Sequence, residues 1–234
     1  MIAIVITLLN SIRHNVEGGF TDGAPCSSRN TAYLNPSKAL FPSETVKCVD
    51  ITAMGKSLVF SGHWPIQQAD SLYADHMQLT RINRTIFAFM PNLELVDFTG
   101  NRIRRIPIDI SSIIPKLTTF LLAKNRVRIP KQRPLMKSRT VKTLMLSHNK
   151  IRALQMMTFT KLPSLQVLYL DSNYLEFITP MMFRSLINLR YLHLGNNLLK
   201  RVPPKSYMPK SLRIYVVKGN QLERKNNATK LELH

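Results

Sequence analysis

An asparagine returns at a nearly constant spacing through this chain, and each asparagine closes the same apolar pattern. The pattern is Leu-x-x-Leu-x-Leu-x-x-Asn, in which Val, Phe or Tyr replaces some of the leucines. Its asparagines, spaced by 24, 24, 24, 24 and 23 residues, are Asn101, Asn125, Asn149, Asn173, Asn197 and Asn220. Six matches at one period indicate a structural repeat, which predicts a solenoid whose units stack on one another.

The Leu-x-Leu part of each motif has the two-residue period of a β-strand with one buried face. One such strand cannot bury that face alone, so we expect successive strands to form a parallel sheet over a shared core. The asparagine amide carries both donors and an acceptor, and we expect it to satisfy backbone groups at a tight bend. We expect the wide convex side to be filled by the aromatic residues at one repeat position, Phe87, Phe159, Phe183 and Tyr207.

These motifs resemble the leucine-rich-repeat family, in the class of 24-residue repeats common in extracellular proteins, over about residues 69–222. The resemblance implies an α/β fold: a right-handed solenoid (horseshoe) with a parallel β-sheet on the concave face and a mostly irregular convex side. Residues 69–92 form a degenerate first repeat, because Met77 stands where the asparagine is expected. Pro107, Pro130 and Pro203 fit an extended path on the convex side.

Four segments follow from this interpretation: a candidate signal peptide and leader (1–23), an N-terminal cap (24–68), about seven repeats (69–222) and a polar tail (223–234). The apolar stretch from Met1 to Leu9 is too short to span a bilayer and resembles the apolar core of a signal peptide. No other segment is apolar for long enough to cross a membrane. We expect the polar tail or the second subunit of a homodimer to cover the last repeat. The third alternative is that the chain is truncated relative to a longer, receptor-like ancestor.

Two cysteines, Cys26 and Cys48, fit one disulfide, and they resemble the cysteine-bearing cap of secreted leucine-rich-repeat proteins. Secretion would also make glycosylation sites of Asn83 and Asn227, which open Asn-x-Thr tripeptides. The sequence therefore favours a secreted, extracellular protein. The alternative is a cytoplasmic leucine-rich-repeat scaffold with two buried thiols.

The net charge of +20 is distributed unevenly. Residues 101–234 carry 26 basic residues against five acidic ones, whereas residues 1–100 carry seven against eight. The first and third positions after three successive asparagines are all basic: Arg102, Arg104, Arg126, Arg128, Lys150 and Arg152. Such a stripe along one lateral edge fits an acidic or sulfated polymer, either a sulfated glycan or a nucleic acid. The alternative is an ordinary solvated surface.

Positions three, five and seven of each motif should face outward on the concave side, where they are apolar, hydroxylated and aromatic. Tyrosines, with an apolar body and a polar tip, are frequent anchors of protein interfaces. We predict a protein-binding face built from Tyr73, Asp97, Met145, Tyr169, Asp171, Tyr191 and His193. The alternative is that these side chains only pack against their neighbours.

Enzyme motifs for nucleotide, metal or acyl-transfer chemistry are missing from the sequence. His193 and Asp171 fall on neighbouring strands, but Ser147 lies two strands from His193, so a catalytic nucleophile is lacking. No Cys/His spacing indicates a metal site. We predict a non-catalytic binding protein with a protein ligand, and without a cofactor, a metal or a small-molecule substrate.

Overall fold

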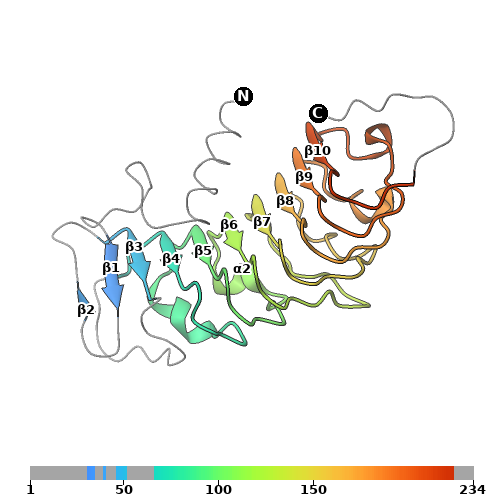
Figure 1. Cartoon of the computed structure of the whole chain (residues 1–234). Coiled ribbons are helices and arrows are strands. Elements are labelled where there is room, and N and C mark those ends of the chain that lie inside the picture. Colours follow the sequence, from blue (N-terminus) through green and yellow to red (C-terminus); the bar gives the residue numbers. More distant parts are fainter. Residues whose placement is uncertain (1–30, 35–38, 41–45, 52–65, 224–234) are drawn as a thin grey trace.

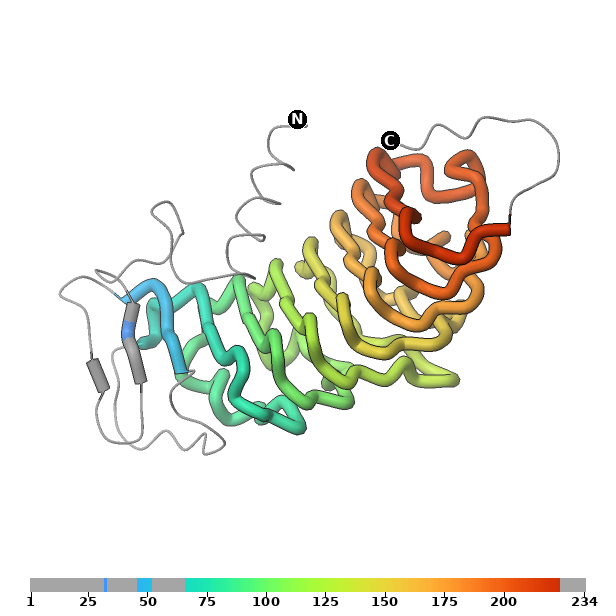
Figure 2. The backbone as a smooth tube through the Cα atoms, viewed as in Figure 1, coloured from blue at the N-terminus to red at the C-terminus, as the bar shows by residue number. Residues whose placement is uncertain are grey.

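The computed structural model describes residues 31–34, 39–40, 46–51 and 66–223. They form one ten-stranded sheet in the order β10-β9-β8-β7-β6-β5-β4-β3-β1-β2. Figure 1 shows these strands side by side along the inner side of a curved solenoid, with loops and short helices on the outer side. Figure 2 shows the repeats as successive coils of one tube. The predicted solenoid with a parallel sheet on its concave face is confirmed.

Each of the six asparagine motifs contains one three-residue strand, and two more of this length come before them in a parallel stack that a four-residue strand completes. The eight strands are β3 (Cys48–Asp50), β4 (Ser71–Tyr73), β5 (Leu95–Asp97), β6 (Thr119–Leu121), β7 (Thr143–Met145), β8 (Val167–Tyr169), β9 (Tyr191–His193) and β10 (Ile214–Val216). β1 (Thr31–Leu34) pairs parallel with β3 and antiparallel with β2 (Ala39–Leu40). β3 belongs to the predicted N-terminal cap, so the sheet continues into that segment.

The strand register places equivalent positions of successive repeats beside one another. Leu144 pairs with Leu168, and Leu168 with Leu192, and all three side chains are fully buried. Phe159 and Phe183 stack behind them with ring centroids 6.1 Å apart, and Phe87 is buried in the first repeat. One core therefore runs the length of the solenoid, as the repeat predicted.

Tyr207 is an exception, and the prediction that it fills the core is wrong. Its side chain is 71% exposed, whereas the neighbouring Met208 is buried. Pro204 precedes a short 3-10 helix, η4 (Lys205–Tyr207), and the chain leaves this turn with Met208 directed into the core. Tyr207 therefore lies at the surface although it shares a repeat position with Phe183.

The convex side has little regular helix, as expected. Its helical segments among the described residues are η2 (Arg84–Phe89), α2 (Ile110–Ile113), η3 (Pro180–Met182) and η4. None of the helices in this part of the chain has both the length and the apolar character needed to cross a bilayer.

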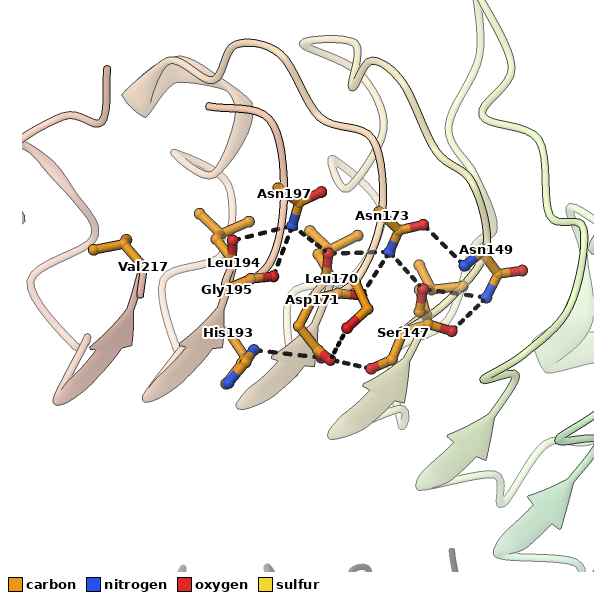
Figure 3. A network of polar contacts seen from close by, with 12 residues as sticks. Ser147, Asn149, Leu170, Asp171, Asn173, His193, Leu194, Gly195, Asn197 and Val217 are labelled. Atoms are coloured by element: carbon orange, nitrogen blue, oxygen red, sulfur yellow. Dashed lines mark hydrogen bonds and ion pairs between the residues drawn. The ribbon is translucent and has the colours of Figure 1, made fainter. Parts of the chain in front are cut away.

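The asparagines form a ladder of hydrogen bonds that joins each repeat to the one before it (Figure 3). The Oδ1 atom of Asn173 accepts from the N–H groups of Asn149 and Ile151, each at 2.9 Å. Its Nδ2 group donates to the carbonyls of Leu146, 2.9 Å away in the preceding repeat, and Leu170, at 3.0 Å in its own. The other buried asparagines with the same cross-repeat bonds are Asn101, Asn125, Asn149 and Asn197. Each amide thus satisfies backbone groups that the bend would otherwise leave buried and unpaired.

The residue before each ladder position has a left-handed backbone. Only two of these residues are glycine, and the φ angles lie between 52° at Asn196 and 80° at Gly219. The series is His76, Gly100, Lys124, His148, Ser172, Asn196 and Gly219. A non-glycine residue in this region costs on the order of 1 kcal/mol. The ladder bonds on either side hold the bend in this conformation.

Met77 is buried at the ladder position of the first repeat, and the ladder starts at Asn101, whose Oδ1 accepts from the N–H of Leu79. The degenerate repeat is thus part of the solenoid. Cys48 is buried at the start of β3, but Cys26 lies outside the described residues, so the disulfide stays a prediction. The leader, Asn227 and the tail beyond residue 223 also lie outside them.

Replacing Asn173 by Ala should lower the free energy of unfolding by roughly 4 kcal/mol, because several buried backbone groups lose their partners together. Asn188→Ala is the matched control: this exposed asparagine donates one bond to the carbonyl of Pro163, and its loss should cost less than about 1 kcal/mol. Urea unfolding of both variants measures the difference. Equal losses would contradict the importance given to the ladder.

Candidate binding surfaces

The seven predicted concave residues lie on the inner side of the sheet. Tyr73, Asp97, Met145, Tyr169 and His193 are the last residues of β4, β5, β7, β8 and β9, and the pairing register makes each an equivalent position. Tyr191 begins β9 and Asp171 follows β8 by two residues. The structure thus places all seven on one face, and their role in binding stays a prediction.

Tyr169, Tyr191 and His193 form an aromatic cluster. The two tyrosine ring centroids are 5.0 Å apart, and His193 lies 6.0 Å from Tyr169 and 6.2 Å from Tyr191, nearly parallel to both rings. Tyr169 also packs against the buried group Leu121, Ala123 and Met145. The rings are therefore held by neighbours on both sides, and an apolar strip runs across β6 to β9.

Asp171 lies beside this cluster and connects two neighbouring repeats (Figure 3). The Ser147 hydroxyl donates to its Oδ1 at 2.6 Å, and His193 Nδ1 lies 3.4 Å from the same oxygen. The Ser172 hydroxyl donates to the other oxygen at 3.2 Å. Burial alone would raise the pKa of Asp171, but the contacts with His193 and Ser147 outweigh burial and lower it. The carboxylate is therefore held ionised at neutral pH.

These side-chain contacts run in the order serine, aspartate, histidine. In a catalytic triad the histidine stands between the other two groups and takes the proton of the serine. Here the Asp171 carboxylate separates Ser147 from His193. The arrangement fixes a carboxylate on the concave face and does not activate a nucleophile. The sequence analysis considered Ser147 only as a nucleophile too far from His193. The 24-residue register makes Ser147 and Asp171 equivalent positions of neighbouring repeats, and this spacing could have predicted their contact.

Gly195 was not predicted as part of this site. Its lack of a side chain leaves room for the ring of His193. A Cβ atom at Gly195 would lie 2.9 Å from His193 Cε1 and 2.9 Å from the carbonyl of Lys218. A larger residue would therefore displace the ring or the neighbouring repeat.

The first strands of the concave face carry acids. The register puts Asp50, Tyr73 and Asp97 side by side on β3, β4 and β5. Asp97 is only 5% exposed and accepts from the N–H of Thr99 at 2.7 Å. Burial raises the pKa of Asp97 to about 6, and burial together with the nearby carboxylates raises that of Tyr73 to about 12. This end of the face therefore has a negative potential.

The six predicted basic residues lie on a different surface, the edge where the chain leaves the strands. All six are exposed. The N–H of Arg126 donates to the carbonyl of Ile103, and that of Arg128 to the carbonyl of Arg104, each at 3.0 Å. These bonds keep successive repeats in register, about 5 Å apart. Within the part of the chain that the structure describes, none of the six forms an ion pair.

No group of three or more His, Cys, Asp or Glu side chains is placed to hold a metal ion within the described ranges. The described residues form two candidate surfaces, an aromatic and acidic concave face and a basic edge, both built on the same repeat.

Comparison with known proteins agrees with the fold. A model of the leucine rich repeat matches residues 139–199 and 165–222. This part of the chain carries leucine-rich repeats. A solved leucine-rich-repeat protein of Leptospira interrogans is 20% identical over 76% of this chain, with a TM-score of 0.52. The match covers 50% of that protein, so the chain spans about half its length, and the likeness shows the fold alone. No curated protein matches the chain in sequence.

The raised pKa of Asp97 predicts a pH-dependent stability. The folded state binds this proton more tightly than the unfolded chain, with a pKa of about 6 against 3.8. Ionised Asp97 therefore destabilises the fold above pH 6, and the cost disappears as the pH falls to about 4. Asp97→Asn should be more stable than the wild type at pH 7.5 by up to about 3 kcal/mol, and equal near pH 4. Urea unfolding across this range measures the difference; a pH-independent one would contradict the assignment.

Proposed function

We propose that this leucine-rich-repeat protein binds a protein ligand on its concave face, with Tyr169, Tyr191 and His193 as anchors. The observation that carries the proposal is the aromatic cluster on the sheet, with ring centroids 5.0–6.2 Å apart. Tyrosine is among the residue types that dominate the energetics of protein interfaces.

The way the cluster is held supports this role. The Tyr169 ring packs against Met145, and the His193 ring stands over Gly195, so both have little rotational freedom to lose on binding. Asp171 adds a fixed negative charge beside the rings, because three side chains contact its carboxylate. A ligand would meet a preorganised surface with an apolar strip and one ionised carboxylate.

We also propose that the protein is secreted. Asn83 is exposed just before η2, where its Oδ1 accepts from the N–H of Thr85, and an exposed turn of this kind is open to glycosylation. The mass of the protein recovered from its native source is the test. Loss of a leader, two hydrogens lost at Cys26 and Cys48, and glycan mass would support secretion, whereas the unprocessed mass with reduced cysteines would support a cytoplasmic scaffold.

Tyr169→Ser combined with His193→Ser should weaken capture of the protein ligand by about 30-fold or more, because interface anchors of this kind contribute about 2 kcal/mol or more. The matched control is Tyr207→Ser with Lys205→Ser, a pair of exposed residues on the convex side. Tagged chains carry each pair of changes, and mass spectrometry quantifies the proteins recovered with them from the native medium. A partner that the concave variant still recovers at wild-type level would rule out the concave face as its site.

The basic edge supports a second candidate function, binding of a polyanion. Six exposed cations in register, without ion-pair partners among the described residues, keep their full attraction for an anionic partner. This surface does not overlap the strand positions that form the concave face. The two functions are therefore separable by mutation.

Binding to heparin should weaken steeply with salt, with a slope set by the number of cations in contact. Arg126→Gln with Arg128→Gln should reduce the slope of log K against log salt by roughly 1.5, if each cation contributes about 0.7 to 0.9. Titrations at several salt concentrations measure the slope. Arg184→Gln with Arg190→Gln, the same loss of charge elsewhere, is the control; an equal effect of both pairs would mean that net charge alone is responsible.

A further inference from the structure

Of the six large apolar side chains that two consecutive repeats expose, five stand within the first eight positions after an asparagine. Their exposed fractions run from 44% at Tyr174 to 60% at Met156. The set, called here the apolar shoulder, consists of Met156, Met157, Tyr174, Phe177 and Met181. Large apolar groups exposed on neighbouring repeats are typical of an interaction surface.

The core does not require these side chains. In the same two segments the core positions are filled by other residues, all buried: Leu154, Phe159, Leu175, Ile178, Met182 and Phe183. The apolar shoulder is thus additional to the set of residues that folds the repeat, and it leaves apolar area in contact with water.

The apolar shoulder continues the basic edge. Tyr174 is the first residue after Asn173, the position that Arg126 and Lys150 hold after their own asparagines. The N–H of Tyr174 donates to the carbonyl of Ile151 at 2.8 Å, which repeats the bond from Arg126 to Ile103. The two surfaces therefore meet between the repeats of Asn149 and Asn173.

The remaining members extend the apolar shoulder toward the convex side. Phe177 is the fourth residue after Asn173, and Met157 and Met181 are each the eighth residue after their asparagines. The 24-residue register therefore places Met157 and Met181 at equivalent positions of neighbouring repeats. Glu176 takes the third position after Asn173, which is held by arginine in the three preceding repeats, so the basic edge ends here.

The combination distinguishes between anionic partners. A sulfated glycan or a nucleic acid would neutralise the arginines, but these hydrated polymers would leave the methionines and Phe177 in water. An anionic bilayer supplies both parts, since its headgroups attract Lys and Arg and its acyl region accepts apolar side chains. We propose that the basic edge and the apolar shoulder together bind the surface of an anionic membrane.

This proposal rests on the second candidate function, an anionic partner for the basic edge, and names that partner as a lipid surface. Contact through the edge and the shoulder would leave the aromatic cluster on β8 and β9 free, because its residues lie on the strands. The chain could then hold a protein ligand on the concave face while lying on a membrane.

The test measures partition of the full chain onto vesicles of phosphatidylcholine with about one third phosphatidylserine, and onto pure phosphatidylcholine. The wild type should bind the anionic vesicles at least about tenfold more strongly. Met157→Ser with Phe177→Ser should lower this binding about tenfold or more, since two side chains no longer enter the acyl region. Arg126→Gln with Arg128→Gln should lower it about 25-fold, at roughly fivefold per cation.

Ile187→Ser with Tyr207→Ser is the matched control, since it removes two exposed apolar side chains at other repeat positions and should change partition less than about twofold. All variants share the N-terminal apolar stretch, so its contribution cancels in the comparison. Wild-type partition by the Met157 and Phe177 variant would overturn the proposal. Retention on heparin with no preference for anionic vesicles would overturn it too, but would be consistent with the second candidate function. A chain that neither stays on heparin nor prefers anionic vesicles would contradict both the membrane proposal and the second candidate function.

Discussion

Each ladder asparagine joins two neighbouring repeats through hydrogen bonds made by a single amide. Asn173 accepts from the preceding repeat at 2.9 Å and donates to it at 2.9 Å, and it also donates to the carbonyl of Leu170 in its own repeat. An amide can do this because it has an acceptor and two donors on one short side chain. The left-handed residue before it, Ser172, turns the chain away from the strand. The 24-residue register therefore depends on this bend, and the register in turn sets which side chains lie together on each surface of the solenoid.

Two surfaces of opposite character follow from that register. Strand positions bring Tyr169 and His193 together on the concave face, with Asp171 ionised beside them. The positions just after the asparagine bring Arg126 and its equivalents together on the edge. Because one bend separates the two sets, the basic residues do not neutralise the carboxylates of the concave face. A chain with a charge of +20 thus keeps an acidic and aromatic concave face.

The motif in the sequence was sufficient to predict the sheet, the core and the location of both surfaces, because the asparagine and leucine spacing fixes the register. It did not reveal β3, since no asparagine follows Cys48–Asp50 at the ladder position. It misplaced Tyr207, because the turn after Pro204 depends on local backbone geometry that spacing does not encode. The burial of Asp97 and the contact of Ser147 with Asp171 depend on neighbouring strands, so they required the three-dimensional structure.

Hydroxyl-radical footprinting of the chain, free and bound to its protein ligand, is the most direct test of binding on the concave face, because it reads the concave and convex sides in one experiment. Tyr, His and Met side chains all react, so the aromatic cluster and the convex side are both visible. The ligand should protect Tyr169, Tyr191 and His193, while Tyr207 keeps its reactivity. Protection of Tyr207 with an unchanged aromatic cluster would contradict binding on the concave face.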